Sequence, residues 1–201
     1  MQNYHSGIPA WGCLTLVSYI PDPLGVFLHS LRRFLPGNHK AQPHVTILPP
    51  RPLRSPKESA SREAQTILRQ FPSFDVELSQ VKCFPQTNMM YLGIAQGDSH
   101  LHRLHRVLNT GGLAYAERFE FLPHLTLGGP VPACSLSTVR DQTASAWRSS
   151  NCSPKFSMLE VVCLWLSPAA VWGDWQRLWS QSLALGHPTL EKAAVAAVTR
   201  T

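Results

Sequence analysis

The octet PHVTILPP at residues 43–50 returns as PHLTLGGP at residues 123–130. Both read proline, histidine, apolar, threonine, apolar, two further residues and proline, and the two histidines, His44 and His124, are 80 positions apart (124 − 44). In a chain with 17 Pro and 9 His, random shuffling yields two Pro-His-x-Thr strings in roughly one sequence per thousand. The repeat is therefore a signal that needs a structural or functional cause.

Each octet has the pattern of a β-strand with two polar side chains on one face. Successive side chains of a strand point to opposite faces, so positions i and i+2 share a face. His44 therefore shares a face with Thr46, and His124 shares one with Thr126. If the two strands are related by a pseudo-twofold axis, two imidazoles and two hydroxyls surround one pocket.

The elements expected around the two octets repeat in the same order, as an internal duplication leaves them. In the first half we expect strand 14–20, helix 24–35, motif strand 44–48, a helix beginning at an N-cap Ser55, and strand 74–84. In the second half we expect strand 89–95, helix 98–112, motif strand 119–127, helix 135–147 and strand 156–166.

This pattern predicts an α+β fold, a bilobal pseudo-twofold duplication in which two antiparallel β-sheets face a central cleft and helices pack outside. We expect one bilobal domain over residues 1–185, with repeats at 13–84 and 88–166 and a closing strand within 172–185. Residues 186–201 contain little to bury and are expected to form a flexible tail.

The composition fits a globular protein with an anionic partner. Hydrophobic residues make up 44% of the 201 residues, which is enough for a core, and the formal charge of +6 favours RNA or a nucleotide phosphate. The five cysteines contain no CxxC pair, so reduced thiols are expected. The first 20 residues lack a basic segment followed by a long apolar run. We therefore expect a cytoplasmic protein, not bound to a membrane, and a monomer.

Two histidines and two threonines suit the chemistry of a phosphodiester. Attack at phosphorus runs in line, so a base on one side activates water and an acid on the other protonates the leaving oxygen. Histidine serves in either role near neutral pH, and threonine hydroxyls hydrogen-bond the non-bridging oxygens. This chemistry needs no metal or other cofactor.

The two motif strands, one per half of a chain of about this length, resemble those of the 2H phosphoesterase superfamily, and the chain is most similar to its bacterial 2′-5′ RNA ligase, or RNA 2′,3′-cyclic phosphodiesterase, branch. The resemblance spans about residues 14–183. It implies a bilobal fold, no metal or ATP, and hydrolysis of a 2′,3′-cyclic phosphate to a 2′-phosphate, or the reverse joining of RNA ends. It also implies that His44 is the acid and His124 the base, although the sequence alone does not order them.

Three further residues are candidates for substrate binding. Many ligase-like members carry a basic residue after the second motif, where this chain has LGGP. Arg51, just after the first octet, is a candidate to supply that charge. Lys82 and Phe84 are candidates to pair or stack with substrate, although a structural role stays open for both.

Two rival interpretations stay open from the sequence. The chain could be a non-catalytic module that binds nucleotides or RNA ends, or a ligase whose main activity is joining. The stretch SHLHRLHR at residues 99–106 suggests zinc binding, but His102 and His105 are three apart and lack a carboxylate. We expect both, with Arg103 and Arg106, on the solvent side of a helix.

Overall fold

The computed structural model describes residues 12–37, 41–171 and 173–185, and the strands of this part form one antiparallel sheet in the order β6-β3-β4-β5-β2-β1-β7-β8. The strands are β1 (Cys13–Tyr19), β2 (His44–Pro52), β3 (Phe74–Cys83), β4 (Met90–Gln96), β5 (His124–Gly128), β6 (Lys155–Met158), β7 (Glu160–Leu166) and β8 (Gln176–Ser182). The helices are α1 (Leu24–Arg32), α2 (Lys57–Gln70), α3 (Asp98–Leu108) and α4 (Leu136–Arg148), with short 3₁₀ turns η1 (Gly111–Leu113) and η2 (Ala133–Ser135). The expected tail 186–201 lies outside the described residues.

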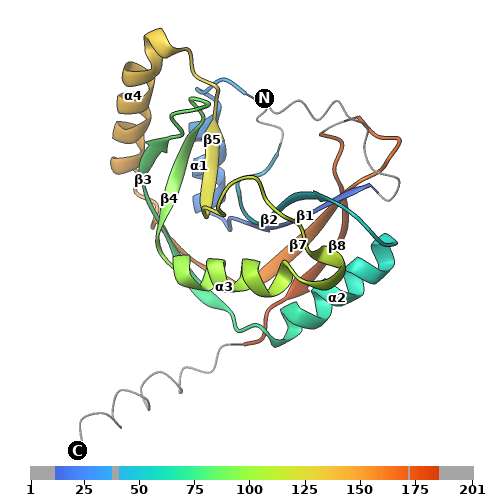
Figure 1. Ribbon diagram of the computed structural model, residues 1–201. Coiled ribbons are helices and arrows are strands. Elements are labelled where there is room, and N and C mark those ends of the chain that lie inside the picture. Colours follow the sequence, from blue (N-terminus) through green and yellow to red (C-terminus); the bar gives the residue numbers. More distant parts are fainter. Residues whose placement is uncertain (1–11, 38–40, 172, 186–201) are drawn as a thin grey trace, which may run out of the picture.

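The expectation of two separate sheets is wrong, because the two motif strands pair with each other. Val45 of β2 is the partner of Leu125 of β5 in an antiparallel ladder. This pair joins the half β2-β1-β7-β8 to the half β6-β3-β4-β5. The joined sheet is strongly curled (Figure 1). The α+β class holds, with one curled sheet in place of two facing ones.

The third strand of each expected repeat pairs in the opposite half of the sheet. β3 pairs with β4 and not with β1, while β7 pairs with β1. The first helix of each repeat crosses over as well, since α1 contacts β5 and α3 contacts β2, whereas α2 contacts β8 and α4 contacts β3 (Figure 1). Sequence periodicity predicts that these elements exist, but the partner of a strand is decided by long-range packing.

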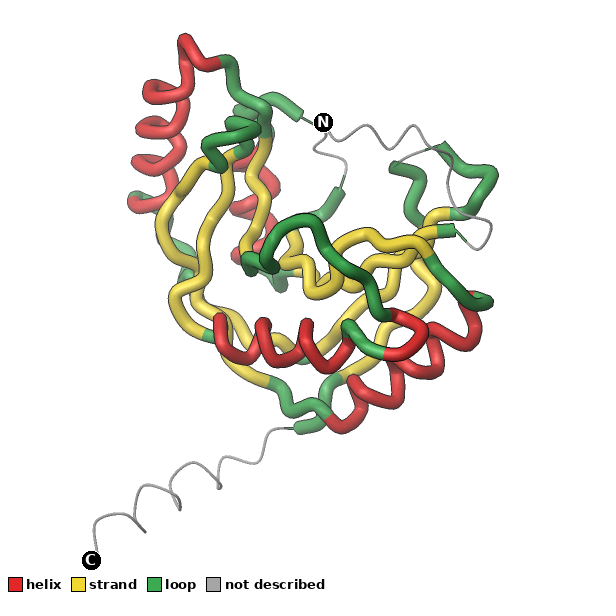
Figure 2. Tube along the Cα trace, viewed as in Figure 1, coloured by secondary structure: helices red, strands yellow, loops and turns green. Residues whose placement is uncertain are grey.

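The strand expected over 156–166 is two strands, β6 and β7, separated by Leu159 alone. β6 pairs with β3 at one edge of the sheet, and β7 lies second from the other edge. Because the sheet curls, the edge that contains β6 and the opposite edge region that contains β7 come close together (Figure 2). Leu183 N donates to Leu159 O at 2.8 Å, and Ala184 N donates to Phe71 O at 2.9 Å. One residue is therefore enough to cross from one edge region to the other.

Two other boundaries differ from expectation for local reasons. The helix expected to begin at Ser55 begins at Lys57, and its N-cap is Pro56 without a side-chain cap bond. The second motif strand begins only at His124, since Pro123 has no N–H to contribute to a ladder. No helix of the described residues is long and apolar enough to cross a membrane.

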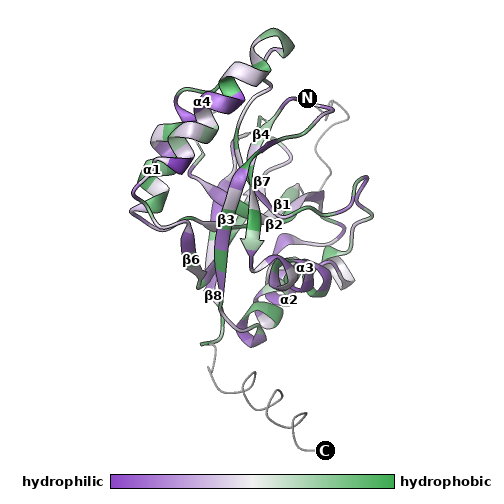
Figure 3. Cartoon of the chain, turned by 90° about the vertical axis from the view of Figure 1, so that its left-hand side faces the viewer, coloured by the Kyte–Doolittle hydropathy of each residue, from purple (hydrophilic) through white to green (hydrophobic). Residues whose placement is uncertain are grey.

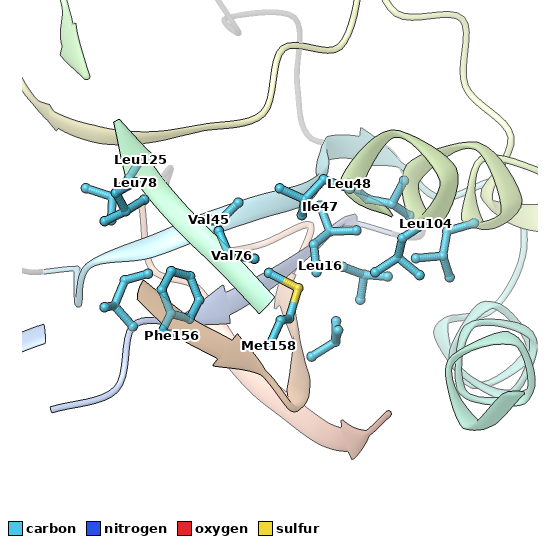
Figure 4. Packing of buried hydrophobic residues seen from close by; sticks show 14 of the residues in the cluster. Leu16, Val45, Ile47, Leu48, Val76, Leu78, Leu104, Leu125, Phe156 and Met158 are labelled. Atoms are coloured by element: carbon cyan, nitrogen blue, oxygen red, sulfur yellow. The ribbon is translucent and has the colours of Figure 1, made fainter. Parts of the chain in front are cut away.

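The core fixes the orientation of both motif strands. Val45, Ile47, Leu125 and Leu127 are fully buried, whereas the histidines and threonines between them are partly exposed. Figure 4 shows Val45, Ile47 and Leu125 within the buried cluster, and Figure 3 shows how hydropathy varies along the elements. Burying one such side chain contributes about 1.5–3 kcal/mol. A slip of one residue would expose this set and bury the histidines.

Candidate functional site

The two motif histidines make the same hydrogen bond. His44 Nδ1 lies 2.7 Å from Gln42 O, and His124 Nδ1 lies 2.7 Å from Leu122 O. A carbonyl oxygen only accepts, so Nδ1 carries the proton and donates in both rings. In the neutral rings Nε2 is then left with its lone pair. Both imidazoles are thus held in the tautomer that exchanges a proton through Nε2.

The pairing of Val45 with Leu125 sets the relative position of the four motif side chains. In an antiparallel ladder the next positions outward are also opposite each other. His44 is therefore placed across from Thr126, and Thr46 across from His124. We call the side of the sheet that carries these four residues the motif face.

Burial lowers the pKa of both histidines. The pKa of His44 is lowered mainly by loss of hydration, opposed by the bond to Gln42, and lowered further by the charges of Arg32 and His124. The pKa of His124 is lowered by the same loss of hydration, opposed by the bond to Leu122. Both rings are therefore neutral at neutral pH in the absence of substrate. Because the two rings are close, protonation of one ring disfavours protonation of the other.

Arg32 is a site residue that the sequence analysis missed. Its side chain is buried; Nε donates to Leu127 O at 3.2 Å and Nη1 donates to Ala41 O at 2.8 Å. Leu127 follows Thr126, and Ala41 precedes the residue whose carbonyl accepts from His44, so one guanidinium links β5 to the segment that leads into β2. Its position four residues after Leu28, on the buried stripe of α1, was a usable sequence signal.

Arg51 does not lie free on the motif face, which corrects the expectation that it contacts substrate. Its side chain is 1% exposed, and Nη2 bonds Glu117 Oε1 at 2.5 Å. Nη1 donates to Asn109 Oδ1 at 2.6 Å and to Leu113 O at 2.9 Å. A buried guanidinium needs such partners, so Arg51 ties the end of α3 and the segment after it to β2.

Phe84 and Lys82 do lie beside the second motif. The Phe84 ring stacks on Tyr91 with centroids 4.2 Å apart and meets the His124 ring edge-on at 5.1 Å. Lys82 is the partner of Tyr91 across β3 and β4, and Tyr91 is the partner of Thr126. Directly opposite residues share a face, so Lys82 is on the motif face.

The helix with three histidines is only partly as expected. Arg103 and Arg106 are exposed, but His105 is buried, bonds Glu117 Oε1 through Nε2 at 3.0 Å and stacks on Phe121 at 4.0 Å. Burial, followed by the charges of Arg51, His102 and Arg106, lowers the pKa of His105 to about 4. Within the described residues no group of three or more His, Cys, Asp and Glu is arranged to hold a metal.

The candidate site therefore consists of two histidine and two threonine side chains at the centre of an eight-stranded curled sheet. The model of the 2′-5′ RNA ligase superfamily matches residues 20–161, more than half of the chain. The chain therefore belongs to the 2′-5′ RNA ligase superfamily and is a phosphoesterase-like member of it.

Individual relatives agree with this assignment. The chain is 26% identical over 132 residues to "Putative phosphoesterase GK0864" of Geobacillus kaustophilus, a match that covers 63% of this chain and 75% of the relative. A second relative, from Geobacillus thermodenitrificans, bears the name "Putative phosphoesterase" and is 28% identical over 102 residues, covering 50% of this chain and 58% of that protein.

Solved structures share the fold at low sequence identity. The structure of E. coli LigT complexed with NADP+ has a TM-score of 0.62 at 16% identity and covers 88% of this chain and 99% of that one. LigT complexed with 3′-AMP has a TM-score of 0.60 at 17% identity, covering 86% and 98%. TT0787 of Thermus thermophilus has a TM-score of 0.54 at 16% identity, covering 87% and 100%.

Proposed function

We propose that the protein is a metal-independent phosphodiesterase that hydrolyses 2′,3′-cyclic phosphates at the ends of RNA or of nucleotides. The observation that carries this proposal is the matched geometry of His44 and His124, each with Nδ1 donating to a carbonyl two residues earlier. Two imidazoles fixed in the same tautomer on adjacent strands are suited to act as acid and base on one bound phosphate.

The proposed reaction is a single in-line displacement. One Nε2 takes a proton from water, the water oxygen bonds to phosphorus, and the bond from phosphorus to O3′ breaks. The second imidazole, protonated at Nε2, gives its proton to O3′, so a 2′-phosphate and a 3′-hydroxyl result. By family resemblance His44 is the acid and His124 the base.

The threonines and the neighbouring aromatic residues complete the proposed site. Thr46 and Thr126 lie beside the histidines of the opposite motifs and donate to the non-bridging oxygens, where charge resides during transfer. Phe84, exposed in part and stacked on Tyr91, offers a ring face for a base. Nucleotides named as bound to E. coli LigT, NADP+ and 3′-AMP, support a nucleotide-type substrate here.

The test is product analysis on 2′,3′-cyclic nucleotides and short RNA strands with cyclic ends. We expect release of a 2′-phosphate by the wild type, in the presence of EDTA as in its absence. Stoichiometric binding of nucleotide 2′-phosphates without turnover of any cyclic substrate would decide for a binding module. Joining of RNA ends faster than hydrolysis would decide for a ligase.

A further inference from the structure

Gly93 of β4 is covered by two hydrogen-bond donors from β3. A Cβ atom at Gly93 would lie 2.7 Å from Ser79 Oγ and 3.6 Å from Lys82 Nζ. Gly93 is the direct partner of His124, and opposite residues of a ladder share a face. The Ser79 hydroxyl and the Lys82 ammonium therefore lie together on the motif face, next to His124.

A β-bulge brings these two donors to the same place. In a regular strand positions 79 and 82 point to opposite faces. Leu78 pairs with Ile94 and Val81 pairs with Leu92, so β3 uses three steps (81 − 78) where β4 uses two (94 − 92). The extra residue changes the face to which the following side chains point, so Ser79 and Lys82 come to lie on the same face.

Within the described part of the chain, the Ser79 hydroxyl and the Lys82 ammonium are both available to a ligand. Lys82 is exposed, and no carboxylate of the described chain pairs with it. No hydrogen bond from Ser79 Oγ to another described residue is present either. An ammonium and a hydroxyl side by side, without an acidic partner, form a site for an anion.

This anion site is displaced from the reacting centre. A phosphate between His44 and His124 lies over the midline of β2 and β5. Strands are spaced about 4.8 Å apart, so Gly93 on the next strand is roughly 7 Å from that midline. The separation is comparable to that of neighbouring phosphates along an RNA strand.

The other half of the sheet differs at the corresponding position, where Arg177, the cation whose charge acts on Tyr19, is paired with Glu160 at 3.6 Å. Opposite His44 stands Tyr19, whose ring meets the imidazole edge-on at 6.2 Å. Next to Lys82, in contrast, Tyr91 stacks with Phe84. The His124 side thus combines a cationic donor pair with an aromatic surface, which are the two elements that hold a nucleotide of a single strand.

We propose that Ser79 and Lys82 form a second phosphate subsite, which binds the internucleotide phosphate next to the reacting end. The protein therefore acts on RNA strands in preference to mononucleotides. This inference rests on the proposed function, because it assumes that the cyclic end reacts beside His124.

The test compares kcat/KM on a 2′,3′-cyclic mononucleotide with that on a trinucleotide bearing the same cyclic end. We expect the wild type to prefer the trinucleotide. Lys82→Met should lower kcat/KM on the trinucleotide about tenfold or more, as loss of a charge-assisted contact does, and leave the mononucleotide within about twofold. Lys82→Arg should retain most of the preference, and Ser79→Ala should lose a smaller part of it.

The control is Lys155→Met, which removes the same charge from an exposed lysine on β6 that pairs with Glu77 at 3.4 Å. This substitution should leave kcat/KM unchanged on both substrates. The salt dependence adds a second readout, because one lost phosphate contact makes the slope of log affinity against log salt shallower by about 0.7. Equal losses on both substrates in Lys82→Met, or an unchanged trinucleotide rate, overturn the subsite.

Failure of the proposed function is distinguishable from failure of the subsite. If the wild type hydrolyses neither substrate, the proposed function is wrong. Binding of a trinucleotide with a terminal 2′-phosphate, measured by calorimetry, then tests the subsite directly. Weaker binding in Lys82→Met than in Lys155→Met supports the subsite, and equal binding overturns it.

Discussion

Val45 pairs with Leu125 at the centre of the sheet, and this pair places the histidine of each motif beside the threonine of the other. The two apolar residues are fully buried, so the register that brings the polar side chains together is set by the core. The geometry of the candidate site and the stability of the fold therefore depend on the same strand pair.

Replacement of either threonine by valine should slow the chemical step. Thr46→Val and Thr126→Val keep the side-chain volume and remove the hydroxyl that we propose donates to the phosphate. We expect kcat to fall about 100-fold in each, as for removal of one oxyanion donor. Thr66→Val on α2, whose hydroxyl bonds only Arg62 O among described residues, should leave kcat unchanged. Similar rates for all three variants would exclude the threonines from the reaction.

The pH dependence should reflect the burial of the histidine pair. Burial disfavours imidazolium and lowers the pKa of His44 and His124 below the ordinary 6.5. The form with one neutral and one protonated ring is then most populated below pH 6.5. We expect a bell-shaped kcat/KM profile with its maximum below that value. A bound phosphate anion favours imidazolium, so the kcat maximum should lie at higher pH. A kcat/KM that still rises between pH 7 and 8 would contradict this assignment.

Arg32 should act on His44 through the backbone. Arg32→Met leaves the carbonyls of Ala41 and Leu127 without this donor, and each buried unpaired group costs about 1–3 kcal/mol. We expect reduced stability in urea and, in ¹⁵N spectra of the imidazoles, a mixture of tautomers for His44 while His124 keeps its proton on Nδ1. Arg33→Met, the loss of the adjacent exposed arginine, is the matched control. An unaltered His44 spectrum in Arg32→Met would show that Arg32 does not fix the tautomer of His44.

The pair of Arg51 and Glu117 should matter for folding and not for substrate. Glu117→Gln leaves a buried guanidinium without its charge partner, which costs about 3–5 kcal/mol, whereas Glu120→Gln at an exposed position should cost almost nothing. Urea unfolding measures both. The folded Glu117→Gln protein should keep its KM. A raised KM together with unchanged stability would instead indicate that Arg51 contacts the substrate.

His105 should make the fold sensitive to acid. Its pKa of about 4 in the folded protein lies below the ordinary 6.5, so the unfolded chain binds the proton more readily. This stabilisation is complete above pH 6.5 and is lost as the pH falls towards 4, by at most about 3 kcal/mol. The stability difference between wild type and His105→Gln should shrink over that range when urea unfolding is compared at several pH values. A stability difference that stays constant with pH would contradict the lowered pKa of His105.

Alternation along the two octets is enough to predict which residues share a face, because a strand has a fixed period of two. His44, Thr46, His124 and Thr126 were therefore identifiable from the sequence as one candidate set. The apolar stripe of α3, with Leu101, Leu104 and Leu108 fully buried, is predicted by the same kind of local periodicity.

Long-range choices were not accessible from local patterns. The turn of a single residue at Leu159 depends on the curl of the whole sheet, and the pairing of β3 with β4 depends on packing across the two halves. Buried charges were missed for a similar reason. Arg51 and His105 look like surface residues until the carbonyls and carboxylates that satisfy them are known. Arg32 lies on the buried stripe of α1, but its carbonyl partners could not be predicted from that position.

We propose that His44 and His124 together perform the acid and base steps on a 2′,3′-cyclic phosphate. The most direct measurement is the hydrolysis rate of an RNA trinucleotide with a cyclic end by wild type, His44→Ala, His124→Ala and the double variant, with His102→Ala on α3 as control. Each motif substitution should lower kcat by about 100- to 10,000-fold, and the double variant should be inactive while keeping its circular dichroism spectrum. Hydrolysis by the double variant at the wild-type rate would exclude both histidines from the reaction.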